Sequence, residues 1–163
     1  MVDAGDDAPD FTLPMAQGRA YNDIEPFTLS EALEDGPVVL AFVPAAFTSG
    51  CTEEMCTFTD SLAAFEAVDA QVYGLSADLS FAQNVWLERE GIDVPMLADQ
   101  DREVIRAYDV ILADMYGYFE VAERSVFVVD TDGEVAWTWV RDGDNPDFDP
   151  FVDEVRDVVA SLE

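Results

Sequence analysis

The apolar positions of the chain alternate between short continuous runs and stripes with helical spacing. Continuous runs rich in β-branched and aromatic residues predict buried strands at Pro37–Val43, Gln71–Ser76 and Ser125–Val129. Between these runs, apolar residues recur at spacings of three and four, which is typical of helices that bury one face. Strands that alternate with helices predict an α/β fold with its sheet in the middle.

The same pattern extends over the whole chain and gives no linker, repeat or low-complexity tract. A chain of 163 residues that is 50% hydrophobic is expected to form one domain, residues 1–163, with a sizeable core. The other expected elements are strands at Phe11–Leu13, Pro95–Leu97 and Val135–Val140, and helices at Leu29–Leu33, Gly50–Val68, Leu79–Glu90, Arg102–Tyr108 and Phe148–Leu162. The stretch after Tyr108 is expected to be irregular, and Thr131, Asp132 and Gly133 suit a hairpin turn.

Both cysteines lie in the segment PAAFTSGCTEEMC, which joins the strand at Pro37–Val43 to the next helix. Cys51 falls in the first turn of that helix. The first turn presents unpaired N–H groups and a partial positive charge, which favour the thiolate form of a cysteine. The thiolate is the nucleophilic form, so the sequence predicts a reactive thiol at Cys51. The amide N–H groups of Gly50 and Cys51 are the expected backbone donors.

The order Pro-x-x-x-Thr-x-x-Cys, formed by Pro44, Thr48 and Cys51, resembles the active-site signature of peroxiredoxins of the AhpC/TSA family. The string FTSGCTEEMCTFTD resembles the branch of bacterioferritin comigratory protein and peroxiredoxin Q. The layout of residues 107–140 is similar to the one-cysteine AhpE-type enzymes. The resemblance implies a thioredoxin-like fold, with a central mixed β-sheet flanked by helices. It also implies a thiol peroxidase that reduces hydrogen peroxide and organic hydroperoxides without a cofactor.

Each residue of the signature also has a simpler interpretation. The resemblance assigns Cys51 to peroxide attack, although a buried cysteine also acts as a small hydrophobe. The Thr48 hydroxyl is expected near the sulfur, whereas an ordinary helix N-cap would direct it to the backbone. Pro44 is expected to form an apolar wall that shields the thiolate, and a lone proline would only end the strand.

The thiolate also needs a cation, and the seven basic residues are all Arg, with no Lys or His. Arg124 directly precedes the apolar run SVFVVD, from which it can point toward the junction that carries Cys51. The peroxiredoxin pattern has an Arg at this place, and Glu54 matches a family Glu that orients it. The alternatives are a solvated strand-end charge for Arg124 and a solvated helix face for Glu54.

Cys56 is expected to resolve the oxidised Cys51. Positions five apart on an ideal helix have Cα atoms about 8 to 9 Å apart, beyond the roughly 7 Å limit for a disulfide. The helix must therefore unwind before Cys56 can condense with a sulfenic acid at Cys51, and a thioredoxin-like dithiol would then reduce the disulfide. The alternative is an inert Cys56 and direct reduction of Cys51 by an external thiol. Two cysteines without His do not complete a usual zinc site, so no metal is expected.

The charge is extreme: 36 acidic residues against seven basic ones give a net charge of −29. Such a surface makes nucleic acid and anionic membranes poor partners and resembles proteins from organisms with molar salt in the cytoplasm. The start MVDAGDDAPD lacks a secretory pattern, so a cytoplasmic protein is expected. Its oligomeric state is left open between a monomer and a homodimer. A redox sensor or thiol-disulfide exchange protein is the alternative function, and its slower reaction with peroxide would distinguish it. A noncatalytic binding module is disfavoured by the intact signature.

Overall fold

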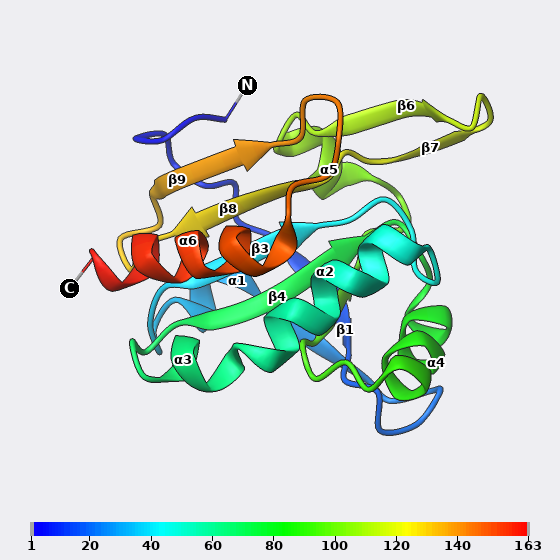
Figure 1. The fold of residues 1–163 in the computed structure, drawn as a ribbon, viewed down its shortest axis with the longest axis horizontal. Helices are drawn as coiled ribbons and strands as arrows, with labels where there is room; N and C mark the ends of the chain where they lie inside the picture. The colour runs from blue at the N-terminus through cyan, green and yellow to red at the C-terminus, as the bar shows by residue number, and fades with distance from the viewer. Residues whose placement is uncertain (1, 163) are drawn as a thin grey trace.

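The computed structural model describes residues 2–162 and is built on a seven-stranded sheet (Figure 1). The strands of this sheet are β1 (Thr12–Ala16), β2 (Ile24–Thr28), β3 (Val38–Phe42), β4 (Gln71–Ser76), β5 (Met96–Ala98), β8 (Ser125–Val129) and β9 (Val135–Val140). Their order is β2-β1-β5-β4-β3-β8-β9. The β3–β4 and β4–β5 pairs are parallel and the other pairs are antiparallel, so the sheet is mixed, as expected.

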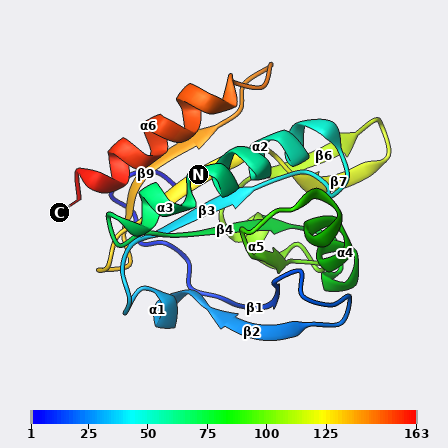
Figure 2. The ribbon, with the colours of Figure 1, turned by 60° about the horizontal axis from the view of Figure 1, so that its bottom comes forward.

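Helices cover both faces of this sheet (Figure 2). One buried cluster packs against α2, α3, α4 and α6, and a second packs against α1 and α5. The helices are α1 (Leu29–Ala32), α2 (Ser49–Asp60), α3 (Leu62–Glu66), α4 (Ser80–Glu90), α5 (Glu103–Ala107) and α6 (Phe148–Ala160). The three-layer arrangement confirms the α/β fold expected from the alternation of apolar runs and helical stripes.

Strand β3 is buried along its whole length because it contributes side chains to both clusters. Val39 and Ala41 belong to one cluster, whereas Leu40 and Phe42 belong to the other. At its C-terminal end, β3 leads directly into the loop before α2. Phe42 pairs with Ser125 of the antiparallel strand β8, so the residue before Ser125 lies at the same end of the sheet. This register brings two distant segments together at the start of α2.

The helix expected at Gly50–Val68 is two helices in the structure. The break is at Ser61, whose φ of −105° and ψ of 2° are not helical. Near the break, the hydroxyl groups of Thr57 and Thr59 donate to the carbonyl oxygens of Glu53 and Met55, both at 2.8 Å. Such bonds compete with the backbone ladder and often bend helices, which gives a physical reason for the break.

Three strands were not expected. Strand β2 contains Pro26, and it lies at the edge of the sheet, where a missing N–H is tolerated. Strands β6 (Ile111–Met115) and β7 (Phe119–Ala122) form a separate two-stranded sheet in the stretch expected to be irregular. Their hairpin projects from the body of the molecule (Figure 1), and its turn is closed by Tyr116 and Gly117 with φ of 55° and 79°. Positive φ at both central residues is typical of a type I′ hairpin turn.

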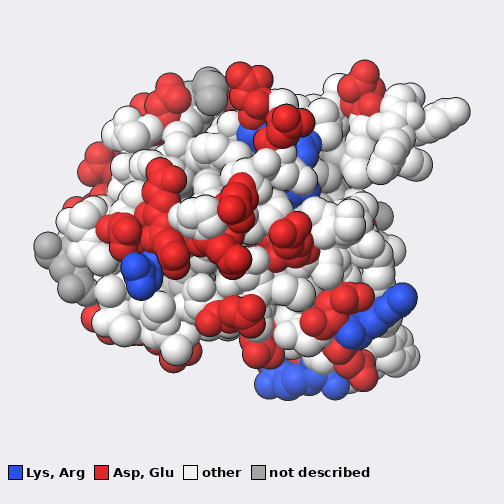
Figure 3. Space-filling view, in the orientation of Figure 1, with Lys and Arg blue, Asp and Glu red and all other residues white. Residues whose placement is uncertain are grey.

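Several aspartates accept hydrogen bonds from backbone N–H groups in turns and loops. Asp99 accepts from Ile105 at 2.8 Å, Asp10 from Ser30 at 2.9 Å. In the expected hairpin turn, where Gly133 has a φ of 83°, Asp130 accepts from two amides at 3.0 Å. Other acidic side chains spread over the visible face, with few basic side chains among them (Figure 3). Within residues 2–162, no helix has the length and apolar character needed to cross a membrane.

Candidate active site

The loop from Val43 to Thr48 connects β3 to α2, and two of its hydrogen bonds involve side chains. The backbone N–H of Ala46 donates to Asp78 Oδ2 at 2.8 Å, and the Thr48 hydroxyl donates to the carbonyl oxygen of Ala45 at 2.8 Å. Phe47, between them, has a φ of 70°, an unusual conformation for a bulky residue. These contacts fix the path by which the chain enters α2.

Cys51 lies in the first turn of α2, as predicted, and it is fully buried. The first helical hydrogen bond joins the N–H of Thr52 to the carbonyl oxygen of Thr48, at 3.0 Å. The N–H groups of Gly50 and Cys51 therefore precede the helical ladder, and no side chain within residues 2–162 caps this end. They lie where the helix dipole is positive, which stabilises negative charge nearby. Thr48 is the N-cap by position, but its hydroxyl points to Ala45 and does not cap the helix.

Arg124 reaches the sulfur from the position directly before strand β8. Its Nη2 donates to Cys51 Sγ at 3.4 Å, and its Nη1 donates to Glu54 Oε1 at 2.9 Å. Arg124 is only 3% exposed, and its guanidinium lies 5.7 Å from the centre of the Phe148 ring. Burial lowers the pKa of Arg124, but the charges of Cys51 and Glu54 outweigh this effect and raise that pKa overall. Arg124 is thus a permanent cation in contact with the sulfur.

Glu54 is fully buried, so the interpretation of a solvated helix face is wrong. Burial raises the pKa of Glu54 from an ordinary 4.5 to about 7, and the neighbouring charge of Arg124 opposes that rise. Its Oε2 atom has no hydrogen-bond partner among the described residues. The carboxyl group therefore depends on Arg124 for its contacts, and it fixes one side of the guanidinium.

Two adjoining pockets open beside this site. The first has a volume of about 200 Å³, and its lining includes Pro44, Thr48, Gly50 and Arg124. The second has a volume of about 360 Å³ and is mainly apolar; its lining includes Ala45, Ala77, Met115, Phe119 and Val121. Pro44, Thr48, Met115 and Tyr116 line both, so the small polar pocket continues into a larger apolar one.

Cys56 lies one and a half turns further along α2 in a different environment. Its Sγ is 3.8 Å from the carbonyl oxygen of Glu90, and its side chain is partly buried. Burial raises the pKa of Cys56, and the carboxylates of Glu90 and Asp60 raise it further. Cys56 is therefore a neutral thiol at neutral pH. Both thiols are free in the structure.

The structure brings five of the six predicted site residues to one end of the sheet: Pro44, Thr48, Cys51, Glu54 and Arg124. Cys56 lies apart from them on the same helix. Sequence reasoning missed Asp78 and two residues of the loop between β9 and α6, Arg141 and Asn145. One sequence feature pointed to Arg141, because it directly follows β9, the strand that pairs with the strand after Arg124. No feature of the sequence pointed to Asn145.

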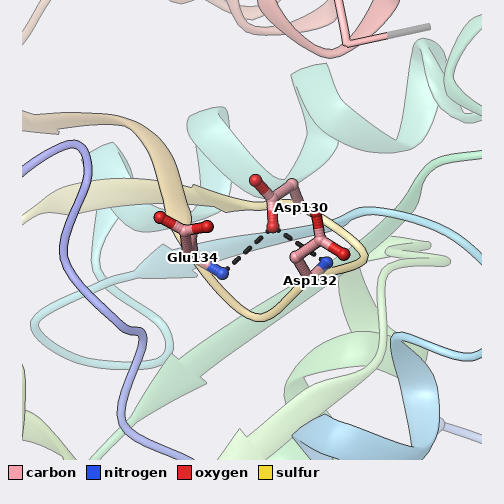
Figure 4. A group of neighbouring side chains, drawn as sticks. All are labelled: Asp130, Asp132 and Glu134. Atoms are coloured by element: carbon pink, nitrogen blue, oxygen red, sulfur yellow. Dashed lines mark hydrogen bonds between the residues drawn. The ribbon is translucent and has the colours of Figure 1, made fainter.

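Three carboxylates lie close together at the far end of β8. The ligand atoms of Asp130, Asp132 and Glu134 are within 4.8 Å of one another, in the turn between β8 and β9 (Figure 4). Asp130 Oδ1 is already used, since it accepts the N–H groups of Asp132 and Glu134 at 3.0 Å. These bonds explain the cluster as a stabilised hairpin turn. Arg124 lies at the opposite end of β8, so the cluster is remote from Cys51.

Comparison with known proteins agrees with this geometry. Residues 4–138 match the family model described as the AhpC/TSA family. A relative from Mycobacterium tuberculosis, named as a peroxiredoxin, is 39% identical over 131 residues, 80% of each chain. The chloroplastic peroxiredoxin Q of Sedum lineare is 30% identical over 164 residues, 99% of this chain and 80% of that protein.

A solved structure extends the likeness to the whole fold. The crystal structure of peroxidoxin BcpB from Mycobacterium tuberculosis matches with a TM-score of 0.85 at 32% identity, covering 100% of this chain and 99% of that chain. A buried cysteine in the first turn of a helix, in contact with a buried Arg, is chemically suited to attack a peroxide. The chain belongs to the AhpC/TSA family and is a peroxiredoxin, an enzyme that reduces peroxides with a thiol reductant.

Proposed function

We propose that Cys51 is the peroxidatic nucleophile and that Arg124 is its cationic partner. The observation that carries this proposal is the 3.4 Å contact between Arg124 Nη2 and Cys51 Sγ at the start of α2. The thiolate attacks one peroxide oxygen, the O–O bond breaks, and its electron pair leaves on the second oxygen, which takes up a proton. Cys51 becomes a sulfenic acid and the peroxide becomes water or an alcohol. Arg124 and the N–H groups at the start of α2 stabilise the charge that develops on the leaving oxygen.

Thr48 and Pro44 would orient the peroxide in the smaller pocket. The hydroxyl hydrogen of Thr48 is used in the bond to Ala45, so Thr48 Oγ1 is left as an acceptor. It can therefore accept the hydrogen of the incoming hydroperoxide and hold that group beside the sulfur. Pro44 has no N–H and presents carbon atoms to the same pocket, which keeps water from competing with the peroxide.

We infer that both hydrogen peroxide and organic hydroperoxides are substrates. Hydrogen peroxide needs only the polar pocket beside Thr48. An organic hydroperoxide also needs room for its carbon chain, and the adjoining apolar pocket of about 360 Å³ offers it. Because the two pockets share Thr48, a reactive group held in one can carry an apolar tail in the other.

We propose that Cys56 resolves the sulfenic acid within the chain. Its thiol would attack the Cys51 sulfur, release water and form a disulfide, which a thioredoxin-like dithiol would then reduce. Two residues five apart on one helix are about 8 to 9 Å apart, so the first turns of α2 must unwind for this step. The string FTSGCTEEMCTFTD, which carries both cysteines and resembles the peroxiredoxin Q branch, supports this cycle over the one-cysteine alternative.

Stopped-flow oxidation of the reduced protein by hydrogen peroxide tests the assignment. Wild type should react orders of magnitude faster than a free thiol, and Cys51→Ser should abolish the reaction. The Arg89→Gln variant changes an exposed side chain and is the matched control for handling and folding. A wild-type rate no faster than that of a free thiol, or a Cys51→Ser protein that still reduces peroxide, would contradict the proposal.

A further inference from the structure

Asn145 completes the set of groups around the Arg124 guanidinium. Glu54 accepts from Nη1 and Cys51 from Nη2, and Asn145 Oδ1 accepts from Nε at 2.9 Å. These three acceptors each take a hydrogen bond from a different nitrogen of the planar guanidinium, so they fix both its position and the direction of its plane. Without Asn145, Nε loses its acceptor and the orientation of the group depends on fewer contacts.

Asn145 also connects Arg124 to a second cation. The same Oδ1 atom accepts from Arg141 Nη1 at 2.8 Å, and Arg141 lines the smaller pocket together with Arg124. Arg141 is held in turn by Glu123, whose Oε1 accepts from Arg141 Nε at 2.8 Å. Burial raises the pKa of Glu54, while the charges of Arg124 and then Arg141 lower it, so the field of Arg141 reaches the buried pair.

The chemical type of Asn145 is informative because of its surroundings. The loop RDGDNPD, residues 141–147, contains three aspartates and a single amide side chain, and the amide is the one that contacts both guanidinium groups. A carboxylate there would accept the same hydrogen bonds and add a negative charge beside Arg124. A neutral acceptor orders both cations and leaves their charge available to the thiolate.

Gly50 shows how closely this group packs on α2. A Cβ atom at position 50 would lie 2.9 Å from Asn145 Nδ2 and 3.1 Å from Arg124 Nη2. Contacts under 3.0 Å do not occur for real Cβ atoms, so a side chain at position 50 would displace the amide, the guanidinium or both. The first turn of α2, Arg124 and Asn145 therefore form one packed unit around the sulfur.

From these contacts we propose that Asn145 is a positioning residue of the peroxidase reaction, whose neutral amide oxygen fixes Arg124 against Cys51 and couples it to Arg141. The inference rests on the proposed roles of Cys51 and Arg124. It predicts that Asn145 affects the thiolate and the rate of peroxide attack, although its side chain does not touch the sulfur.

The test compares Asn145→Ala and Asn145→Asp in a Cys56→Ser background, in which Cys51 is the one thiol that titrates. Asn145→Ala should slow oxidation of Cys51 by hydrogen peroxide on the order of tenfold and move its thiolate titration upward by about one pH unit, equally in dilute and molar KCl. Asn145→Asp keeps the acceptor and adds charge. Its titration should move upward in dilute salt and return toward that of wild type in molar KCl.

Asp144→Ala and Asp144→Asn are matched controls in the same exposed loop, and both should keep the wild-type rate. Circular dichroism verifies that each variant folds, and the isosteric Asn145→Asp covers the case in which Asn145→Ala does not. Variants that lose stability yet titrate and react like wild type would overturn the inference and leave Asn145 a structural residue. A Cys51→Ser protein that reacts at the wild-type rate would instead overturn the proposed function.

Discussion

Replacing Arg124 by Gln should remove the cation from Cys51, together with the hydrogen bonds that Arg124 donates to Glu54 and Asn145. Glu54 would lose the charge that opposes the rise of its pKa, so burial would keep this carboxyl protonated at neutral pH. A neutral Glu54 does not leave an uncompensated buried charge, which would otherwise cost about 3 to 5 kcal/mol. We therefore expect Arg124→Gln to fold and its main defect to be chemical.

The size of that defect follows from the 3.4 Å separation of Nη2 and Sγ. Two unit charges at this distance attract by about 5 kcal/mol at an effective dielectric of about 20. Desolvation of both groups offsets part of this attraction, and a hydrogen bond to a charged group contributes about 1.5 to 3 kcal/mol net. At roughly 1.36 kcal/mol per pH unit, the thiolate titration should move upward by about one to two pH units. Loss of the same donor in the transition state should slow peroxide attack on the order of 10²-fold.

Ultraviolet thiolate absorbance against pH and stopped-flow oxidation measure the two quantities. Arg156→Gln is the matched control, because the Arg156 side chain is partly exposed, at 39%, and pairs with its neighbour Asp157. An Arg124→Gln protein whose thiolate titration is unshifted would refute the reasoning. Another cation would then be the group that stabilises the Cys51 thiolate. Equal slowing in both variants would refute it as well, since the effect would then reflect net charge.

Three further predictions concern the second thiol, the buried acid and the surface. Cys56→Ser should retain the first oxidation and accumulate sulfinic acid at Cys51 under excess peroxide, and intact-mass spectra that match wild type would favour the one-cysteine cycle. Because burial raises the pKa of Glu54 to about 7, the folded state should lose stability as pH rises from about 4.5 through 7. The free energy of unfolding of Glu54→Gln relative to wild type, measured with urea, should therefore increase with pH across that window. A difference between the two proteins that stays constant with pH would contradict this. With a net charge of −29, the melting temperature should rise between about 0.1 M and 2 M KCl; equal values would contradict adaptation to salt.

The sequence predicted the elements that are determined by local burial. Strand β3 is buried on both faces, so its apolar run was unambiguous, and the reactive helix start after it followed from the same boundary. Arg124 was identified because it directly precedes a second such run and because the peroxiredoxin pattern has an Arg at this place. In contrast, β2 contains a proline, and the hairpin of β6 and β7 has mixed exposure, so neither shows a clear period of two.

The contacts of Asn145 could not be predicted from sequence patterns, for a different reason. Asn145 is exposed, lies in a loop without periodicity and meets Arg124 across 21 positions of the chain. Only the register of β8 and β9 and the path of the following loop bring the two together. Glu54 was predicted through the family resemblance, but its burial was not, because a buried carboxyl looks the same in the sequence as the solvated ones around it.

The aspartates that accept backbone N–H groups have a consequence for how the fold is expected to respond to concentrated salt. Exposed ion pairs such as Arg19 with Asp23 are weakened by dissolved salt, because ions screen charges that face water. Asp99 is 2% exposed and accepts an amide hydrogen at 2.8 Å, a short and shielded contact that screening affects much less. Aspartate carboxylates therefore stabilise turns of this chain through hydrogen bonds that need no cation. Concentrated salt can then relieve repulsion at the surface while the connections between strands and helices keep their shape.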